Sequence, residues 1–133
     1  MMSATDLSNP FSESGTPDSN ILIERMQESD LDEVLNIEHV SFSMPWTRNM
    51  FETELRETTL SYPIIARWFD AFKDSENSNK KPITKKPICG YCVFWHVVDE
   101  IHVGNLAVAL EFRRKGIAAA LIKNIITLGQ QWH

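Results

Sequence analysis

The stretch NLAVALEFRRKGIAAALIKNIITLG, residues 105–129, changes character half-way along its length. It begins as a strand-like apolar run and ends with apolar residues at helical spacing: Ile117, Leu121, Ile122, Ile125 and Ile126. Between the two segments lie three cations and a glycine, residues 113–116. We therefore predict a strand, a charged turn and a helix that runs from about Lys115 to about Gln131.

The charged turn has the features of an anion site. The start of a helix exposes unpaired backbone N–H groups and the positive end of the helix dipole, where phosphates bind. Gly116 lets the backbone approach such an anion without a β-carbon, and Ala118 and Ala119 keep the first turn small. Full positive charges at the rim come from Arg113, Arg114 and Lys115. The pattern favours a pyrophosphate site. An ordinary basic turn remains the alternative, because the two common phosphate-binding motifs, G-x-G-x-x-G and G-x-x-x-x-G-K-S/T, are both absent.

Composition limits the class of protein. The 133 residues suit one domain, and 43% hydrophobic with 23% charged residues is ordinary for a globular protein. The net charge of -5 argues against nonspecific binding of nucleic acid. No apolar run approaches the ~20 residues that span a bilayer, and the N-terminus lacks a secretory pattern. We expect a cytoplasmic protein without a membrane partner.

Two cysteines, Cys89 and Cys92, form a C-x-x-C pair inside the strand-like run PICGYCVFWHVV. A redox or zinc role needs a helix N-terminus or a second ligand pair, and neither is visible in the sequence. Residues three apart on a regular strand point to opposite faces. We therefore expect two reduced thiols in a strand and no metal.

The rest of the chain predicts the element order β-α-α-β-β-β-α. A polar N-terminal tail at 1–20, expected to be disordered, precedes a domain at 21–133. Strands are expected at 21–26, 61–69, 88–98 and 101–108, the last two as a hairpin that turns at Asp99-Glu100. Ser29 or Asp30 can cap a first helix and Thr47 a second. A polar loop at 73–87 is interpreted as a solvated connection, with a basic recognition loop as the alternative.

The charged turn and three further segments resemble the GNAT superfamily of N-acetyltransferases. The family's acetyl-CoA motif, Q/R-x-x-G-x-G/A, is matched by Arg113, Gly116 and Ala118. The segments IEHVSFSMPWTRNMFETEL, GYCVFWHVVDE and IHVGNLAV resemble the first two helices and the third and fourth strands of the RimI-type enzymes, which acetylate the N-terminal alanine of a ribosomal protein. The resemblance implies an α+β GNAT fold, with a mixed, mostly antiparallel sheet flanked by helices.

The resemblance also implies where acetyl-CoA binds. In such enzymes the fourth strand supplies backbone groups to the pantetheine arm, at positions that match Leu106, Ala107 and Val108. Backbone amides of the following turn hold the pyrophosphate, at positions that match Arg114, Lys115, Gly116, Ile117, Ala118 and Ala119, with Arg113 as the first motif residue. Because backbone groups bind, the side chains there can vary while Gly116 cannot.

Transfer of an acetyl group requires a neutral amine and a donor for the developing oxyanion. An α-amine has a pKa near ~8, so a modest base is enough. His102 is the candidate base, because its place on the fourth strand resembles that of the base in several GNAT enzymes. Simple alternation puts it on the face of Leu106, although a bulge would change that, and a merely packed histidine is the alternative. Weaker candidates are Glu100, His96 and His39, and by resemblance the oxyanion donor is the N–H of Val108 or Leu106.

The acceptor groove and the end of the domain follow from the resemblance alone. Phe42, Pro45 and Trp46 match the loop that lines the peptide groove, unless these aromatics only cover the core. The family continues with a fifth strand bearing a glutamate base and a helix bearing an asparagine and a tyrosine acid, none of which is found up to His133. We expect an incomplete fold whose fourth strand has an exposed edge prone to self-association.

These expectations lead to a leading function and two rivals. The leading hypothesis is transfer of acetyl from acetyl-CoA to a protein N-terminal amine, with a ribosomal protein as a candidate partner. The rivals are a GNAT enzyme that acetylates a small-molecule amine and a truncated, non-catalytic fragment that binds acyl-CoA.

Overall fold

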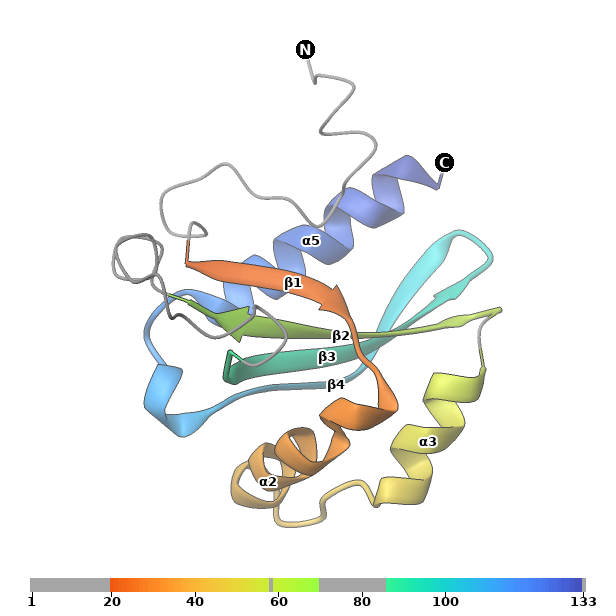
Figure 1. The fold of residues 1–133 in the computed structure, drawn as a ribbon. Coiled ribbons are helices and arrows are strands. Elements are labelled where there is room, and N and C mark those ends of the chain that lie inside the picture. The colour runs from red at the N-terminus through yellow and green to blue at the C-terminus, as the bar shows by residue number, and fades with distance from the viewer. Residues whose placement is uncertain (1–19, 58, 70–85, 133) are drawn as a thin grey trace.

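The computed structural model describes residues 20–57, 59–69 and 86–132, and Figure 1 shows a sheet between helices. The strands are β1 (Ile21–Arg25), β2 (Ser61–Trp68), β3 (Ile88–Val97) and β4 (Glu100–Val108). The helices are α2 (Leu31–Ser41), α3 (Arg48–Arg56) and α5 (Ile117–Gln131), with short 3-10 turns η1 (Glu28–Asp30) and η3 (Leu110–Phe112). The predicted element order is confirmed, whereas the tail at 1–19 and most of the predicted polar loop, residues 73–85, lie outside the described residues.

The four described strands pair in the order β1-β2-β3-β4, and each pairing is antiparallel. Val97 pairs with Glu100, so the hairpin turns at Val98 and Asp99, one residue earlier than the sequence indicated. Val98 has a φ of 55°, which completes the tight turn. Within the described residues β4 lies at the edge of the sheet, which leaves one side of its backbone without a strand partner.

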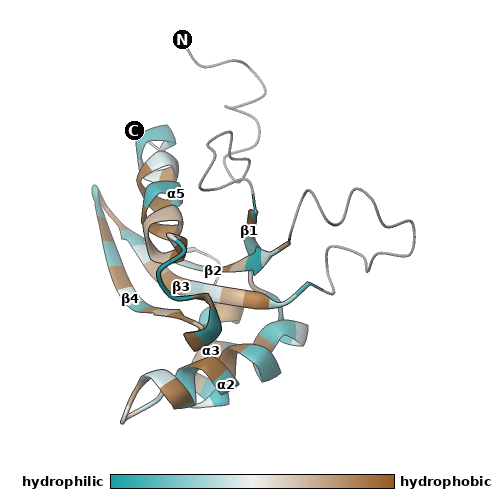
Figure 2. Ribbon diagram, turned by 90° about the vertical axis from the view of Figure 1, so that its left-hand side faces the viewer, coloured by the Kyte–Doolittle hydropathy of each residue, from teal (hydrophilic) through white to brown (hydrophobic). Residues whose placement is uncertain are grey.

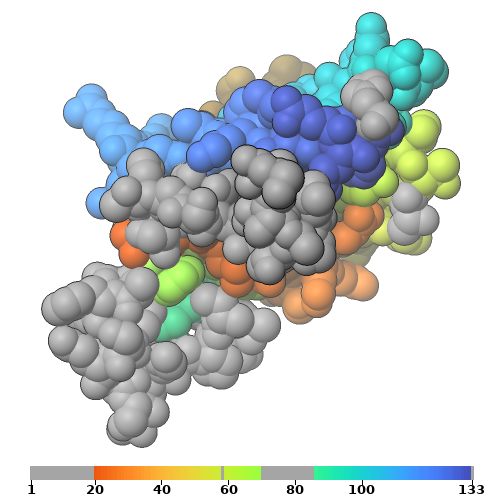
Figure 3. Space-filling model, turned by 90° about the horizontal axis from the view of Figure 1, so that it is seen from above, coloured from red at the N-terminus to blue at the C-terminus, as the bar shows by residue number. Residues whose placement is uncertain are grey.

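Each face of the sheet has its own core. Figure 2 shows α5 on one side of the sheet and α2 with α3 on the other, and Figure 3 looks down on α5 along the top of the molecule. The core under α5 contains Ile21, Ile23, Ile64, Ala66, Cys89, Cys92, Phe94, Ile117, Ala120, Leu121, Ile125 and Leu128. The core under α2 and α3 contains Met26, Leu31, Val34, Phe51, Ile65, Ile88, Tyr91, Val93 and Ala107. None of the described helices has the length and apolar character needed to cross a membrane.

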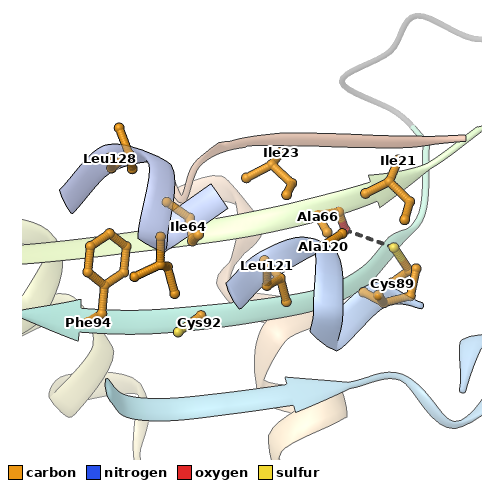
Figure 4. Packing of buried hydrophobic residues seen from close by; sticks show 12 residues of the cluster. Ile21, Ile23, Ile64, Ala66, Cys89, Cys92, Phe94, Ala120, Leu121 and Leu128 are labelled. Carbon is orange, nitrogen blue, oxygen red and sulfur yellow. Dashed lines mark hydrogen bonds between the residues drawn. The ribbon is translucent and has the colours of Figure 1, made fainter. Parts of the chain in front are cut away.

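A β-bulge at the start of β3 corrects the prediction for the two cysteines. The register jumps from Ala66↔Gly90 to Arg67↔Ile88, so Cys89 is an extra residue that resets the alternation. As a result Cys89 and Cys92 both lie in the core under α5, where Figure 4 shows them. The Cys89 thiol lies 3.3 Å from the carbonyl oxygen of Ala66. The expectation of two reduced thiols is confirmed, and that of opposite faces is wrong, since both thiols are buried in the same core.

The predicted helix caps had different outcomes. The Thr47 hydroxyl accepts a hydrogen bond from the Met50 N–H at 3.2 Å, which confirms the cap of α3. Asp30 does not cap α2 with its side chain. Its carboxylate accepts from the Gln27 N–H at 2.8 Å and pairs with Arg67 at 2.6 Å. Buried charge therefore ties η1 to β2, because a buried carboxylate needs a partner.

Candidate active site

Helix α5 begins at a glycine in a conformation that other residues rarely adopt. Gly116 has φ 79° and ψ 16°, and its carbonyl accepts from the Ala120 N–H at 3.0 Å. A β-carbon added there would meet no atom within 4 Å, so steric crowding does not explain the glycine. The left-handed backbone explains it, because that conformation costs other residues roughly 1–2 kcal/mol. Arg114, with φ 67°, shares this strain, and the two together turn the chain sharply into the helix.

The start of α5 presents a row of unbonded backbone donors. Ile117, Ala118 and Ala119 are the first three residues of the helix, whose N–H groups have no intrahelical acceptor. The capping residue is a glycine, so no side chain takes these bonds. Among the described residues, none accepts a hydrogen bond from the N–H groups of residues 114–119. The positive end of the dipole and these donors together favour an anion.

A pocket of about 380 Å³ opens at this turn. It is lined by Val108, Arg113, Arg114, Gly116, Ile117, Ala118 and Ala119, all of them predicted cofactor residues. Three other predicted residues, Leu106, Ala107 and Lys115, do not line it. Ala107 is 6% exposed in the core under α2 and α3, and the Lys115 ammonium lies 5.5 Å from the centre of the Trp68 ring. The pocket is thus walled by backbone, small side chains and two arginines.

The free edge of β4 leads directly to the pocket. The Ala109 N–H donates to the Cys89 carbonyl at 2.8 Å. Because residues of an antiparallel pair alternate in direction, Ala107 also bonds toward β3, whereas Leu106 and Val108 direct their N–H and C=O groups outward. The Val108 carbonyl accepts from Arg113 Nε at 3.2 Å, which agrees with this direction. Leu106 and Val108 therefore offer backbone groups beside the charged turn.

His102 lies on the other face of β4 from Leu106. The register jumps from Val93↔Asn105 to Phe94↔Val103, so Gly104 is an extra residue that forms a bulge. The face predicted by simple alternation is therefore wrong, and His102 shares the α2–α3 face with Asn105. Its side chain is 52% exposed, and its Nε2 lies 2.9 Å from the carboxylate of Glu100. The structure brings these two candidate bases together at the exposed hairpin.

The two weaker histidine candidates lie elsewhere. His96 stacks on Trp132 with ring centres 4.6 Å apart, on the α5 side of the sheet. His39 lies on the exposed side of α2, in its last turn. Neither is next to the pocket.

Close packing fixes the bulge of β4. A β-carbon on Gly104 would lie 2.1 Å from a ring atom of Trp95, so only glycine allows this approach. The Trp95 indole N–H donates to Glu54 at 2.6 Å, and the same carboxylate oxygen accepts from the Ser61 hydroxyl at 2.7 Å. A tryptophan held from α3 thus forms a wall over the bulge, on the face of His102.

The three predicted acceptor residues have different surroundings. Trp46 is half-buried and packs on Phe51 with ring centres 5.1 Å apart. Pro45 is half-buried, and Phe42 is 38% exposed. Packing therefore accounts for Trp46, whereas Phe42 retains surface that a ligand can contact.

Sequence reasoning missed a buried carboxylate at the centre of the α2–α3 face. Glu38 is 1% exposed and accepts hydrogen bonds from the Tyr91 hydroxyl, from Asn105 Nδ2 at 2.8 Å and from the Trp46 N–H at 2.8 Å. Burial, together with the adjacent Glu38 carboxylate, raises the pKa of the Tyr91 phenol far above its usual range. Tyr91 and Asn105 are 53 and 67 residues away in the chain, so no local pattern could reveal the contact.

The thiols have the chemistry of core residues. Burial raises the pKa of Cys89 and that of Cys92 from 9.0 to about 12, which disfavours the reactive thiolate. In the part of the chain that the structure describes, no group of three or more His, Cys, Asp or Glu side chains could hold a metal ion.

A family model supplies the identification that this geometry suggests. The model of the acetyltransferase (GNAT) family matches residues 31–133, which include the charged turn and the pocket. The chain belongs to the GNAT acetyltransferase family. Members of this family use acetyl-CoA as the acetyl donor.

Relatives of the chain agree with this assignment. A protein of Bacillus subtilis (strain 168), provisionally named a ribosomal protein bS18-alanine N-acetyltransferase, is 27% identical over 106 residues, which are 80% of this chain and 60% of that protein. The chain thus spans about 60% of the length of this curated relative.

Two solved structures share the fold. The ribosomal-protein-S18-alanine N-acetyltransferase of Escherichia coli has a TM-score of 0.59 at 20% identity, with 84% of this chain and 61% of that chain covered. Ard1 of Thermoplasma volcanium has a TM-score of 0.64 at 17% identity, with 84% of this chain and 65% of that chain covered. The GNAT fold predicted from the sequence is confirmed.

Proposed function

We propose that the chain transfers an acetyl group from acetyl-CoA to the N-terminal amine of a protein, with the pyrophosphate of coenzyme A bound at the start of α5. The observation that carries the proposal is the row of unbonded N–H groups at residues 114–119. Five of these six residues, all but Lys115, line a pocket of about 380 Å³, and Arg113 lines it as well. A pyrophosphate would satisfy the donors and the arginines at once, because it carries several acceptor oxygens and negative charge.

The pantetheine arm would extend along β4 from this pocket. The outward N–H and C=O groups of Leu106 and Val108 suit its two amides, because an extended chain can pair with a strand edge. In this placement the acetyl thioester reaches the middle of β4, where the N–H of Leu106 or Val108 can stabilise the oxyanion. The amine then forms a C–N bond to the carbonyl carbon, and the C–S bond breaks as the thiolate of coenzyme A leaves.

His102 is proposed as the group that takes the proton of the amine. An imidazole is a common general base, and Glu100 can orient the ring through Nε2. The pair is exposed and on the α2–α3 face, so we propose that the acceptor approaches from that side. Phe42, Pro45 and Trp46, in the loop after α2, are proposed to contact the acceptor there. The names of the Bacillus and Escherichia coli relatives support an N-terminal alanine of a ribosomal protein as the acceptor, and such a substrate would place the protein in the cytoplasm.

The proposal is tested by replacing Gly116 and measuring cofactor affinity and transfer on the 133-residue chain. Gly116→Val introduces a branched residue at φ 79° and is expected to weaken binding of coenzyme A by about 30-fold or more in calorimetric titration. Ile126→Val, at an exposed position of the same helix, is the matched control and should leave the affinity unchanged. Equal affinity for coenzyme A in the wild type and in Gly116→Val would overturn the proposal that coenzyme A binds at the start of α5.

Mass spectrometry of an Ala-starting peptide separates the proposal from its two rivals. A mass gain of one acetyl group on the peptide supports protein N-terminal acetylation. Transfer to a small amine but to no peptide would support a small-molecule acetyltransferase. Retained binding of coenzyme A without any transfer would support an acyl-CoA-binding fragment.

A further inference from the structure

Residues 42–46, which we call the acceptor loop, are held at both ends by one residue, Glu38. At the first end the Phe42 N–H donates to the backbone carbonyl of Glu38 at 3.0 Å. At the second end the Trp46 N–H donates to the carboxylate of Glu38 at 2.8 Å. Between these points the loop presents exposed apolar surface, with Phe42 38% and Met44 88% exposed. The position of this surface therefore depends on Glu38.

The same carboxylate connects the acceptor loop to β4. One oxygen, Oε2, accepts from Trp46, and the other, Oε1, accepts from both the Tyr91 hydroxyl and Asn105 Nδ2. Asn105 lies between the bulge at Gly104 and the outward backbone of Leu106. Glu38 thus fixes the distance between the loop and the part of β4 where the thioester is proposed to lie.

As the three donors are arranged, the carboxylate accepts from all of them. A glutamine in the same position has one oxygen and one NH₂ group, so either its NH₂ faces the Trp46 N–H or the Tyr91 hydroxyl and the Asn105 amide must both turn to accept. At 1% exposure no solvent relieves that conflict, and an unsatisfied buried donor is costly. Ring packing also connects the loop to β3, because Trp46 packs on Phe51 and Phe51 packs edge-on against Tyr91 with ring centres 5.9 Å apart.

We propose that Glu38 is a positioning residue for the amine acceptor, which it serves by locking the acceptor loop to β4 at Asn105. Since its side chain is 1% exposed, it acts through Trp46 and Asn105 and not by touching the substrate. This inference rests on the proposed function for the identity of the acceptor, but the locked loop is a structural claim in its own right. The pocket at the charged turn shares none of these residues, so we expect the affinity for coenzyme A to change little when Glu38 is replaced.

Glu38→Gln in the full 133-residue chain tests the inference with two readouts. The first is hydrogen exchange of the Trp46 amide, which is expected to become at least tenfold faster in the variant. The second is steady-state transfer to an Ala-starting peptide, where the KM for peptide is expected to rise at least tenfold while the affinity for coenzyme A changes less than twofold. Glu28→Gln, the same exchange at an exposed glutamate of η1, is the matched control and should change neither readout.

The outcomes separate this inference from the proposed function. If no amine is acetylated by the wild type, the proposed function fails. Hydrogen exchange of the Trp46 amide still tests whether Glu38 holds the acceptor loop in place. Unchanged exchange at Trp46 in Glu38→Gln overturns the inference, as does an equal loss of peptide and coenzyme A affinity. Should Glu38→Gln not fold, Asn105→Ala removes one donor and keeps the carboxylate. That variant is expected to raise the peptide KM at least threefold at constant coenzyme A affinity, and an unchanged KM overturns the inference.

Discussion

The face of the sheet under α5 buries hydrocarbon, two thiols and the side-chain amide of Asn124, whereas the face under α2 and α3 buries a carboxylate with three hydrogen-bond donors. On the α5 side the polar groups that suit a ligand belong to the backbone of the charged turn, and they come from six consecutive residues, 114–119. On the α2–α3 side the polar groups are side chains from α2, β3 and β4. A phosphate site built from backbone tolerates changes of side chain, and a loop held by a side-chain network does not.

The largest expected effect concerns the thiols of the α5 face. Burial raises the pKa of Cys89 and Cys92 to about 12, so both should resist a disulfide reagent in the folded protein and react more than about 100-fold faster in urea. A raised folded-state pKa also stabilises the fold below pH 9, and this contribution is lost as pH rises from 9 toward 12. Reagent kinetics and urea titrations at several pH values check both statements. Fast reaction of either thiol in the native protein would contradict the burial.

Removal of the buried carboxylate should be the most destabilising change on the α2–α3 face. Glu38→Ala leaves three donors unpaired, and we expect the free energy of unfolding to fall by about 3–5 kcal/mol. The measurement is urea denaturation followed by circular dichroism. Asp32→Ala, which removes only an exposed ion pair with Arg48, is the control and should cost less than about 1 kcal/mol. A loss of similar size in the control would show that burial of the Glu38 carboxylate is not what makes this position sensitive.

The bulge of β4 should be the next most sensitive point. Gly104→Ala places a β-carbon 2.1 Å from the Trp95 ring, and we expect about 1–3 kcal/mol of destabilisation from the displaced indole. Trp95→Leu in the same chain removes the obstacle, so the cost of Gly104→Ala should be smaller in that background. A double-mutant cycle in urea measures the difference. Additive effects would show that the ring does not impose the glycine.

The charged turn should be less sensitive to the addition of a methyl group. Gly116→Ala meets no atom within 4 Å, so only the backbone strain remains, and we expect about 1 kcal/mol of destabilisation. Thermal and urea unfolding measure it beside Gly104→Ala. If Gly116→Ala were the more costly of the two, the turn would be packed and not open.

The smallest effect is expected for the arginines of the turn. Arg113 is exposed, and its side chain donates a hydrogen bond to the Val108 carbonyl, so Arg113→Ala should change the free energy of unfolding by less than about 0.5 kcal/mol. Its affinity for coenzyme A should fall about fivefold, because one charge at the rim is lost. The Lys115 ammonium lies over the Trp68 ring and not at the pocket, so Lys115→Ala should lower the affinity for coenzyme A by less than Arg113→Ala does. Calorimetry at two salt concentrations measures both, and a larger loss for Lys115 would contradict the geometry.

The predicted parts of the fold and site are those with local causes. The apolar spacing from Ile117 to Ile126 predicted α5, Thr47 predicted the start of α3, and seven of the residues assigned to cofactor binding line one pocket. Prediction of the faces failed where a bulge added a residue, at Cys89 and at Gly104, because a bulge depends on the partner strand. Asp30 could not be assigned correctly, since its partner Arg67 is 37 residues away.

The sequence by itself determined the order of elements, the charged turn and the resemblance to a family, because spacing, capping and a left-handed glycine act within a few residues of the chain. Only the tertiary structure decided which face His102 occupies and that Glu38 holds the acceptor loop against β4. A buried carboxylate becomes stable when distant donors meet it away from water, and that meeting depends on the register of the whole sheet.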